Sequence, residues 1–386
     1  MKFQRTMGFW RMMILVPRIL FFLVLGTGLA PSEPSGAASF SLGERKETAA
    51  RKGMVYLSKE EILEGARKEA KVVVAPGHDE LTIPALIQAF QKKYPFIKDV
   101  SWYNVQGSAA EQRQLLEMKA GRANVDAFSP HQAYYNEYRK FNPFKKYDLQ
   151  AMIEDGQKKI PLEMIDDSGV VAWLGSSMGI VLYNSRIVPP DRIPTGWESC
   201  LDPQWKGKIY VDTKPLDLAR LTPKWGPEKV LDFAKRLKEN GPIWGRGQTA
   251  GITRLIAGEF PLMCPAYFHS PQRMLKKDPK LPIKMVIPDP LPVGLNEPGA
   301  VYVNAKSPHA GLLWLEFLAS KEGQDVVESI EPGRGSVLVE GTAAHKLARG
   351  TNAALCGPGC SDQTDRLMER IAVEAWGFPK LGYTPK

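Results

Sequence analysis

The chain has 386 residues, a formal net charge of +9 and 44% hydrophobic residues. This hydrophobic content supports packed cores and excludes an intrinsically disordered chain, and the length indicates two domains of ordinary size. The basic residues are spread along the chain, without the clustered basic face of a nucleic-acid-binding protein, so no nucleic-acid partner is expected. A mildly basic protein of this kind favours anionic ligands.

The N-terminus has the pattern of an export signal. Lys2, Arg5 and Arg11 precede an apolar run at residues 19–30, which is too short to span a bilayer comfortably. No cysteine follows this run directly, so a lipid anchor is not expected. We expect cleavage near Ala37 and a mature protein in the periplasm, and the alternative is an uncleaved signal anchor.

From residue 71 onward, short apolar strands alternate with helices, which predicts an α/β fold with a largely parallel sheet. The preceding lead-in is polar and has little periodicity until a capping box of Ser58 and Glu61 begins a helix. A second capping box is expected at Ser108 and Glu111. The strands are expected at residues 71–74, 100–105, 125–128, 175–184, 208–211, 243–244, around 263, 283–287 and 300–303, and the helices at 83–94, 108–121, 134–138, 227–240, 250–257 and 309–319.

Three of the five histidines, His78, His131 and His269, come just after predicted strands. In open α/β sheets, ligands bind outside the carboxyl ends of the strands. Imidazole is also a common metal ligand. The pattern therefore predicts a ligand site, although a single histidine in a loop would more often be only solvated.

Four cysteines fit an exported protein that does not depend on a disulfide scaffold. Cys356 and Cys360 are expected to close a small local disulfide, and the alternative is a redox or metal-binding dithiol. Cys200 and Cys264 are interpreted as buried thiols.

Several segments together resemble the extracellular solute-binding proteins of ABC importers, and most closely the branch that contains the ferric-ion-binding proteins. The resemblance covers about residues 71–335 and is carried by segments 71–90, 179–184, 197–209, 258–259, 299–306 and 307–324. It implies an α/β, type II periplasmic binding protein fold, with two α/β lobes joined by crossover strands and a ligand cleft between them. The implied crossovers lie near residues 179–184 and 283–288.

The resemblance also implies a division of the chain. The expected parts are a signal peptide at 1–37, a lead-in and N-terminal helix at 38–70, a first lobe at 71–178 plus 289–335, a second lobe at 179–288, and a C-terminal helical segment at 336–386 that packs on the lobes.

The ferric-binding branch takes its metal ligands from three places. Here His78, His131 and the Tyr267–His269 segment correspond to them. His131 stands where the branch has a carboxylate, and Phe268 interrupts its tyrosine pair. Imidazole suits zinc, copper and nickel as well as iron, so ferric iron is one option among several. The expected metal ligands are His78, His131, Tyr267 and His269.

The same branch holds a companion anion at helix N-termini, where backbone N–H groups and the helix dipole favour negative charge. Gln132, Gln248 and Thr249 match such places, and Lys214 could supply positive charge. The alternative is that Gln248 and Thr249 only cap a helix. The expected ligand-binding residues are His78, Ser108, Gln132, Lys214, Gln248, Thr249, Tyr267 and His269.

We therefore expect the substrate-binding component of an ABC transporter, which captures a metal ion or metal chelate of the ferric type between its lobes. A permease and ATPase in the inner membrane would be its partners, and it would act as a monomer without a cofactor other than the transported metal. The alternatives are the same role for a small organic anion, a periplasmic metal-dependent enzyme, or a ligand sensor. The chain has no HExxH, nucleophile elbow or Walker loop, which argues against an enzyme.

Overall fold

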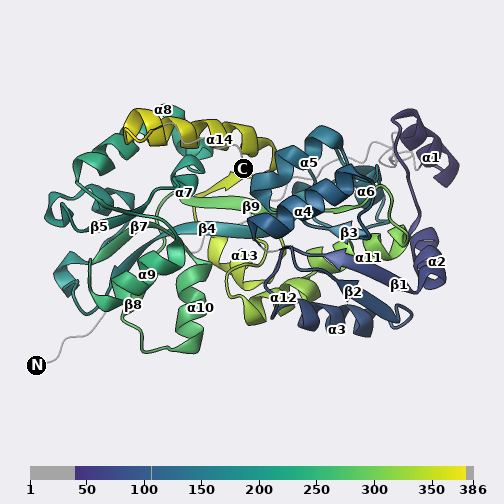
Figure 1. Ribbon diagram of the computed structural model, residues 1–386, viewed down its shortest axis with the longest axis horizontal. Coiled ribbons are helices and arrows are strands. Elements are labelled where there is room, and N and C mark those ends of the chain that lie inside the picture. The colour runs from purple at the N-terminus through teal and green to yellow at the C-terminus, as the bar shows by residue number, and fades with distance from the viewer. Residues whose placement is uncertain (1–39, 106, 380–386) are drawn as a thin grey trace, which may run out of the picture. The chain divides into compact units, whose positions relative to one another are not determined.

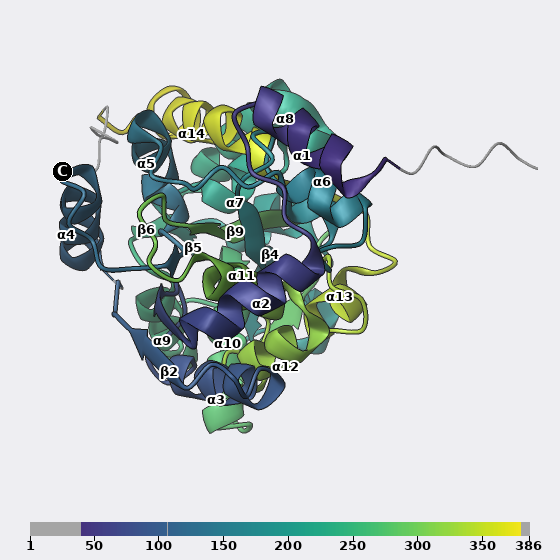
Figure 2. The ribbon, with the colours of Figure 1, turned by 90° about the vertical axis from the view of Figure 1, so that its right-hand side faces the viewer.

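The structure is a computed structural model that describes residues 40–105 and 107–379. The export signal expected at residues 1–37 lies outside the described residues. In the described part, no helix combines the length and the apolar character needed to cross a membrane. Figure 1 shows helices on both faces of a central sheet, and Figure 2 gives the view from its right-hand side.

Within the described residues, ten strands form one mixed sheet with the order β2-β1-β3-β9-β4-β7-β5-β6, while β10 pairs with β9 and β8 pairs with β4. At one end β1 is parallel to β2 and β3, and at the other end β5 is parallel to β6 and β7. The strands are β1 (Lys71–Ala75), β2 (Asp99–Trp102), β3 (Ala127–Phe128), β4 (Ala172–Asn184), β5 (Ile209–Asp212), β6 (Ile243–Gly245), β7 (Leu262–Tyr267), β8 (Ile283–Val286), β9 (Leu291–Val301) and β10 (Ala353–Cys356).

The helices connect and cover these strands, as the alternating pattern predicts. The longest, α8, contains a break at Gly226, where the backbone leaves the helical region. The helices are α1 (Leu42–Arg51), α2 (Lys59–Glu69), α3 (Ile83–Lys93), α4 (Ser108–Lys119), α5 (Tyr135–Phe141), α6 (Leu149–Glu154), α7 (Leu216–Ala219), α8 (Thr222–Glu239), α9 (Gln248–Ala257), α10 (His269–Lys277), α11 (Pro308–Ala319), α12 (Lys321–Ile330), α13 (Ala343–Ala348) and α14 (Ser361–Arg370).

Two long antiparallel strands, β4 and β9, join the two ends of the sheet. They pair with each other from Ala172 opposite Gly299 to Met178 opposite Val293. Beyond this stretch β4 pairs with β7 and β8, whereas β9 pairs with β3. The second crossover is therefore β9, not residues 283–288 as expected, and the short β8 only pairs with the end of β4. Pro292 and Pro298 lie within β9, and proline weakens the sequence signal of a strand.

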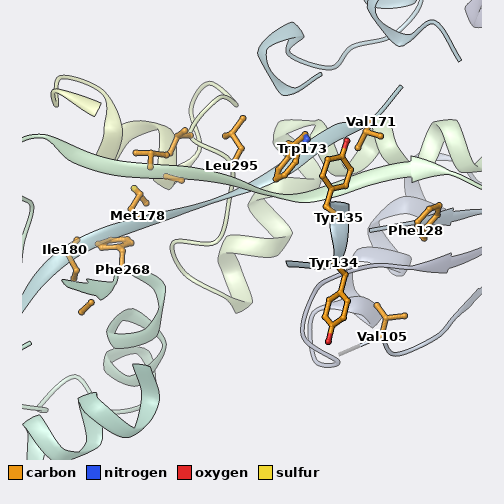
Figure 3. Packing of buried hydrophobic residues seen from close by; sticks show 14 of the residues in the cluster. Val105, Phe128, Tyr134, Tyr135, Val171, Trp173, Met178, Ile180, Phe268 and Leu295 are labelled. Atoms are coloured by element: carbon orange, nitrogen blue, oxygen red, sulfur yellow. The ribbon is translucent and has the colours of Figure 1, made fainter. Parts of the chain in front are cut away.

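The core follows this arrangement. All thirteen residues of β4 are buried, and one hydrophobic cluster runs along β4 and β9. In Figure 3, Tyr135 meets Trp173 edge to face, with ring centroids 5.1 Å apart, while Phe268 lies beside Met178. Separate clusters fill the two ends of the sheet, one under α2, α3 and α11 and the other under α7, α8 and α14.

Several local expectations can be compared with the structure. The capping box of Ser58 and Glu61 is confirmed at the start of α2. The second box is wrong, because α4 begins at Ser108 without a side-chain cap, and Glu111 instead accepts a hydrogen bond from the backbone N–H of His131 at 3.3 Å. The lead-in, expected to lack periodic structure, contains α1, and Lys52 directly after it pairs with Asp148 at 3.2 Å.

Two disulfides are present. The local Cys356–Cys360 disulfide is confirmed. Cys200 and Cys264 were expected to be thiols, but they are joined by a disulfide although 64 residues separate them in sequence. Spacing alone could not reveal this bond, because the two cysteines come together only when β7 packs beside the segment that precedes β5.

Candidate functional site

The three histidines at the strand ends lie around one arginine. His78 follows β1 and is only 3% exposed, His131 follows β3, and His269 is the first residue of α10 after β7. Burial is the largest cause that lowers the pKa of each of the three imidazoles, and the positive charge of Arg334 lowers all three further, so all three lie within its electrostatic reach. The structure thus brings together histidines that are 191 residues apart at the extremes, from position 78 to position 269.

Arg334 is held by two carboxylates. Its guanidinium pairs with Glu297 of β9 and donates to Glu331, at the end of α12, at 3.0 Å. Glu331 also accepts hydrogen bonds from the Thr82 hydroxyl at 2.6 Å and from the Asp79 backbone at 3.2 Å. The two carboxylates raise the pKa of Arg334, so its charge is permanent. Sequence reasoning missed this residue, whose one local signal was the Pro-Gly turn that precedes it.

The imidazoles are biased toward their neutral form. Burial is the main cause of the lowered pKa of all three histidines, and it brings the pKa of His269 to about 4. His131 is exposed to solvent, yet protein atoms surround its ring closely enough to lower its pKa as burial does for the other two. The Nδ1 atom of His269 is buried and has no hydrogen-bond partner among the described residues. Neutral imidazole is the form that coordinates metal ions.

A second polar cluster surrounds Arg220, at the end of α7. Its guanidinium donates to Ser177 of β4 at 2.7 Å, to Asp217 at 3.1 Å and to the side chain of Gln132 at 3.3 Å. Burial outweighs the attraction of Arg220 and raises the pKa of Asp217 to about 6. Gly294 of β9 makes the close approach possible, because a Cβ atom there would overlap the guanidinium of Arg220.

Lys214, in the loop after β5, and Gln248, the first residue of α9, lie close to this cluster and both bond to Asp212. Burial and the charge of Arg220 lower the pKa of Lys214. The side chain of Gln248 donates to Asp212 at 3.2 Å and accepts from the backbone N–H of Tyr267 at 2.9 Å. Gln248 is therefore a structural link between β5 and the end of β7.

The remaining expected residues have different surroundings. The Tyr267 and His269 rings stack with centroids 5.8 Å apart. Thr249, in the first turn of α9, is exposed. Ser108 begins α4, and the surroundings of its side chain lie outside what the structure describes. Across the described residues, no group of three or more histidine, cysteine, aspartate or glutamate side chains is arranged to hold a metal ion.

Comparison with solved structures identifies the fold. Iron-bound HitA from Pseudomonas aeruginosa is similar with a TM-score of 0.60 at 16% identity, over 78% of this chain and 99% of that one. IdiA (FutA) from Trichodesmium, in complex with iron and citrate ligands, reaches 0.64 at 17% identity, over 80% and 100%. A Bordetella ferric binding protein also reaches 0.64, at 15% identity, over 80% and 100%. The fold is thus that of the type II periplasmic binding proteins, with two α/β lobes, and β4 and β9 are its crossover strands.

Residues 85–327 match the model of the family described as bacterial extracellular solute-binding protein. The chain belongs to this family. No curated protein sequence matches it. Extracellular solute-binding proteins of this kind are transport proteins that deliver ligands to ABC permeases, so the chain is the solute-binding component of an ABC transporter and not an enzyme. Such proteins carry no cofactor, and any iron is the transported ligand.

Proposed function

We propose that this solute-binding protein captures a metal ion together with a companion anion, as a chelate of the ferric type, and delivers it to an inner-membrane permease and its ATPase. The position of His131 is the observation that carries this proposal. Burial is the main cause that lowers the pKa of His131, and this pKa is also raised by Glu297 and lowered by Lys214 and Arg334, so the imidazole lies within electrostatic reach of both polar clusters. A ligand at His131 would have nitrogen donors on one side and positive charge on the other.

The two sides suit the two parts of a chelate. His78, His131, His269 and Tyr267 would be the candidate metal ligands. Lys214, with Gln132 and Arg220 near it, would hold the anion, because a buried positive charge attracts carboxylate oxygens. We propose that Ser108, Gln248 and Thr249 line the same site through their backbone N–H groups. One similar protein of known structure was solved with iron and citrate, which supports this choice of ligand.

A small organic anion without a metal is the second candidate. It is favoured by the positive charges of Lys214 and Arg220 and by the absence of a group of three metal-binding side chains among the described residues. An organic anion would hydrogen-bond to these cationic residues and to the imidazoles.

Calorimetric titration with ferric citrate, citrate alone and zinc separates the two candidates. If a chelate is the ligand, His131→Ala weakens ferric citrate binding at least tenfold, Lys214→Ala weakens citrate and ferric citrate alike, and His345→Ala on α13 serves as the matched control. Tight binding of citrate alone that is unchanged in His131→Ala would instead establish the organic anion. Because burial lowers the pKa of the histidines, metal affinity is expected to fall only well below pH 6.5, later than free imidazole implies.

We also propose that the protein is a periplasmic monomer whose lobes are residues 71–178 with 289–335 and residues 179–288. Size-exclusion chromatography with light scattering tests the monomer, and N-terminal sequencing of the periplasmic form tests cleavage near Ala37. A membrane-bound form that retains residues 19–30 would contradict the export proposal.

A further inference from the structure

The C-terminal segment at residues 353–376 lies beyond residue 327, where the match to the family ends. Its strand β10 adds to β9 in parallel, from Ala353 opposite Leu291 to Cys356 opposite Gly294. The chain then turns through the Cys356–Cys360 disulfide into α14. The Thr364 hydroxyl lies 3.1 and 3.3 Å from the two sulfur atoms and donates to the Cys360 carbonyl at 2.8 Å. A residue of α14 therefore stabilises the turn, or corner, that the disulfide closes.

One side of this segment is anchored in the hydrophobic cluster at the β5–β7 end of the sheet. Leu367, Met368 and Ile371 are buried there against α7 and α8. The indole N–H of Trp376 donates to the Ala234 carbonyl of α8 at 3.1 Å. Burial of large apolar side chains makes this a firm attachment.

The other side of the segment reaches the β1–β3 end of the molecule. The Asn136 amide of α5 donates to the Asp362 carboxylate of α14 at 3.2 Å. At the corner, a Cβ atom on Gly359 would lie 3.4 Å from the Asp167 carboxylate, in the loop before β4. Both views show α14 between α8 and α5. The segment therefore contacts both ends of the sheet, apolar on one side and polar on the other.

The segment is also joined to the candidate site. Helix α14 packs on α7, the helix that carries Asp217 and precedes Arg220. Asp365 of α14 is electrostatically coupled to Lys214, since each of the two charges favours the ionised form of the other. A movement of α14 would therefore change the electrostatic surroundings of Lys214 and the packing of the helix that precedes Arg220.

We propose that residues 353–376 act as a strap that ties the two lobes together and limits how far they open, with Asn136 and Asp362 as the positioning residues of the tie. The apolar side stays with α7 and α8 during any movement, and the exposed Asn136–Asp362 hydrogen bond is the contact that breaks. The Cys356–Cys360 disulfide keeps α14 at the angle from which Asp362 meets α5. The strap does not depend on which ligand the protein binds.

The test uses the full mature protein without ligand and compares Asn136→Ala, Asp362→Ala and the double variant with wild type. Hydrogen–deuterium exchange in α5 and α14 is expected to become about two- to fivefold faster in each single variant. This is the change in protection that follows from removing one exposed hydrogen bond. The double variant is expected to equal the single variants, because both remove the same bond. The radius of gyration from small-angle X-ray scattering is expected to increase in all three.

Gln150→Ala is the matched control, since it removes an exposed amide–carboxylate hydrogen bond of 3.0 Å to Glu154 within α6 alone. A second, independent variant replaces Cys356 and Cys360 by serine and is expected to speed exchange in residues 353–370. Wild-type exchange and radius of gyration in both single variants would overturn the strap. Additive effects in the double variant would also overturn it, because Asn136 and Asp362 would then act separately.

Discussion

Arg334 forms ion pairs with two buried carboxylates, those of Glu297 and Glu331. Replacing it in Arg334→Met leaves Glu297 and Glu331 buried without a counter-charge, which is expected to lower the free energy of unfolding by about 3–5 kcal/mol. Urea unfolding at pH 7.5 measures this loss. The control Arg254→Ala breaks the exposed pair with Glu259 and is expected to cost about 0–1 kcal/mol. Equal losses in the two variants would contradict a buried charge network at Arg334.

His269 is expected to make the protein sensitive to acid. Its pKa is about 4 in the folded protein, whereas an unfolded imidazole titrates near 6.5, so between these values only the unfolded state binds the proton. Stability therefore falls as pH drops through this window, by up to about 3 kcal/mol. Denaturant melts of His269→Asn between pH 4 and 7 should show a flatter pH dependence than wild type.

Glu111 is expected to give the opposite pH dependence of stability. Burial raises its pKa to about 7, so the folded state binds the proton first and wild-type stability falls as pH rises from 4.5 to 7. Glu111→Gln keeps the acceptor for the His131 backbone and removes this slope. If the two variants changed the pH dependence in the same direction, the assigned shifts would be wrong.

The sequence indicated where the candidate site residues come in the chain, because a histidine that follows a strand can be recognised without coordinates. It could not predict their surroundings. Arg334 is distant in sequence from the His78 loop and follows α12, and only the packing of α12 beside α3 brings the two together. Gln248 matched an anion-binding position in sequence, but its side chain bonds to Asp212 and Tyr267.

Gly294 lets helix α7 approach strand β9. Gly294→Ala is expected to displace the Arg220 guanidinium, to destabilise the protein by about 1–3 kcal/mol through overpacking, and to weaken anion binding. Thermal unfolding and citrate titration measure the two effects. Gly196→Ala is the matched control, because nothing lies within 4 Å of a Cβ atom there. A wild-type melting temperature in Gly294→Ala would show that Arg220 is not held against β9.

The two disulfides are expected to differ in their contribution to stability. Loop entropy gives about 4 kcal/mol for the Cys200–Cys264 bond, which spans 64 residues, and about 2 kcal/mol for the Cys356–Cys360 bond, which spans 4. Paired serine variants, unfolded in urea without reductant, compare them. A larger loss from the Cys356 and Cys360 pair would show that native contacts, and not loop length, dominate.

The elements that the sequence predicted well have strong local signals, such as the capping box of α2 and the alternating strands and helices. The elements it missed depend on distant partners. Helix α1 is polar, and its Arg45, together with Lys52 just after the helix, pairs with residues around α6. Strand β10 exists because β9 offers an edge beside Leu291. The Cys200–Cys264 disulfide was missed for the same reason, because its two cysteines are distant in sequence.

The whole molecule is expected to close on its ligand, since hinge closure is a common response of periplasmic binding proteins. Small-angle X-ray scattering with saturating ferric citrate should give a smaller radius of gyration than the ligand-free protein. The crossover strands β4 and β9 are the expected hinge, because β4 pairs with β7 and β8 at one end, β9 pairs with β3 at the other, and the pairing of β4 with β9 joins the two ends. A profile unchanged by a ligand that calorimetry shows to bind would contradict closure.

The pairing of β9 with β3 has a consequence for the order in which the protein can fold as it emerges from a ribosome or a translocation channel. Ala127 of β3 pairs with Val301, so the sheet around β1 and β3 cannot be completed until residue 301 has emerged. Contacts so distant along the chain make folding slow. The sheet around β1 and β3 therefore stays incomplete for most of the synthesis, and an incompletely folded chain is what an export channel for unfolded polypeptides would require.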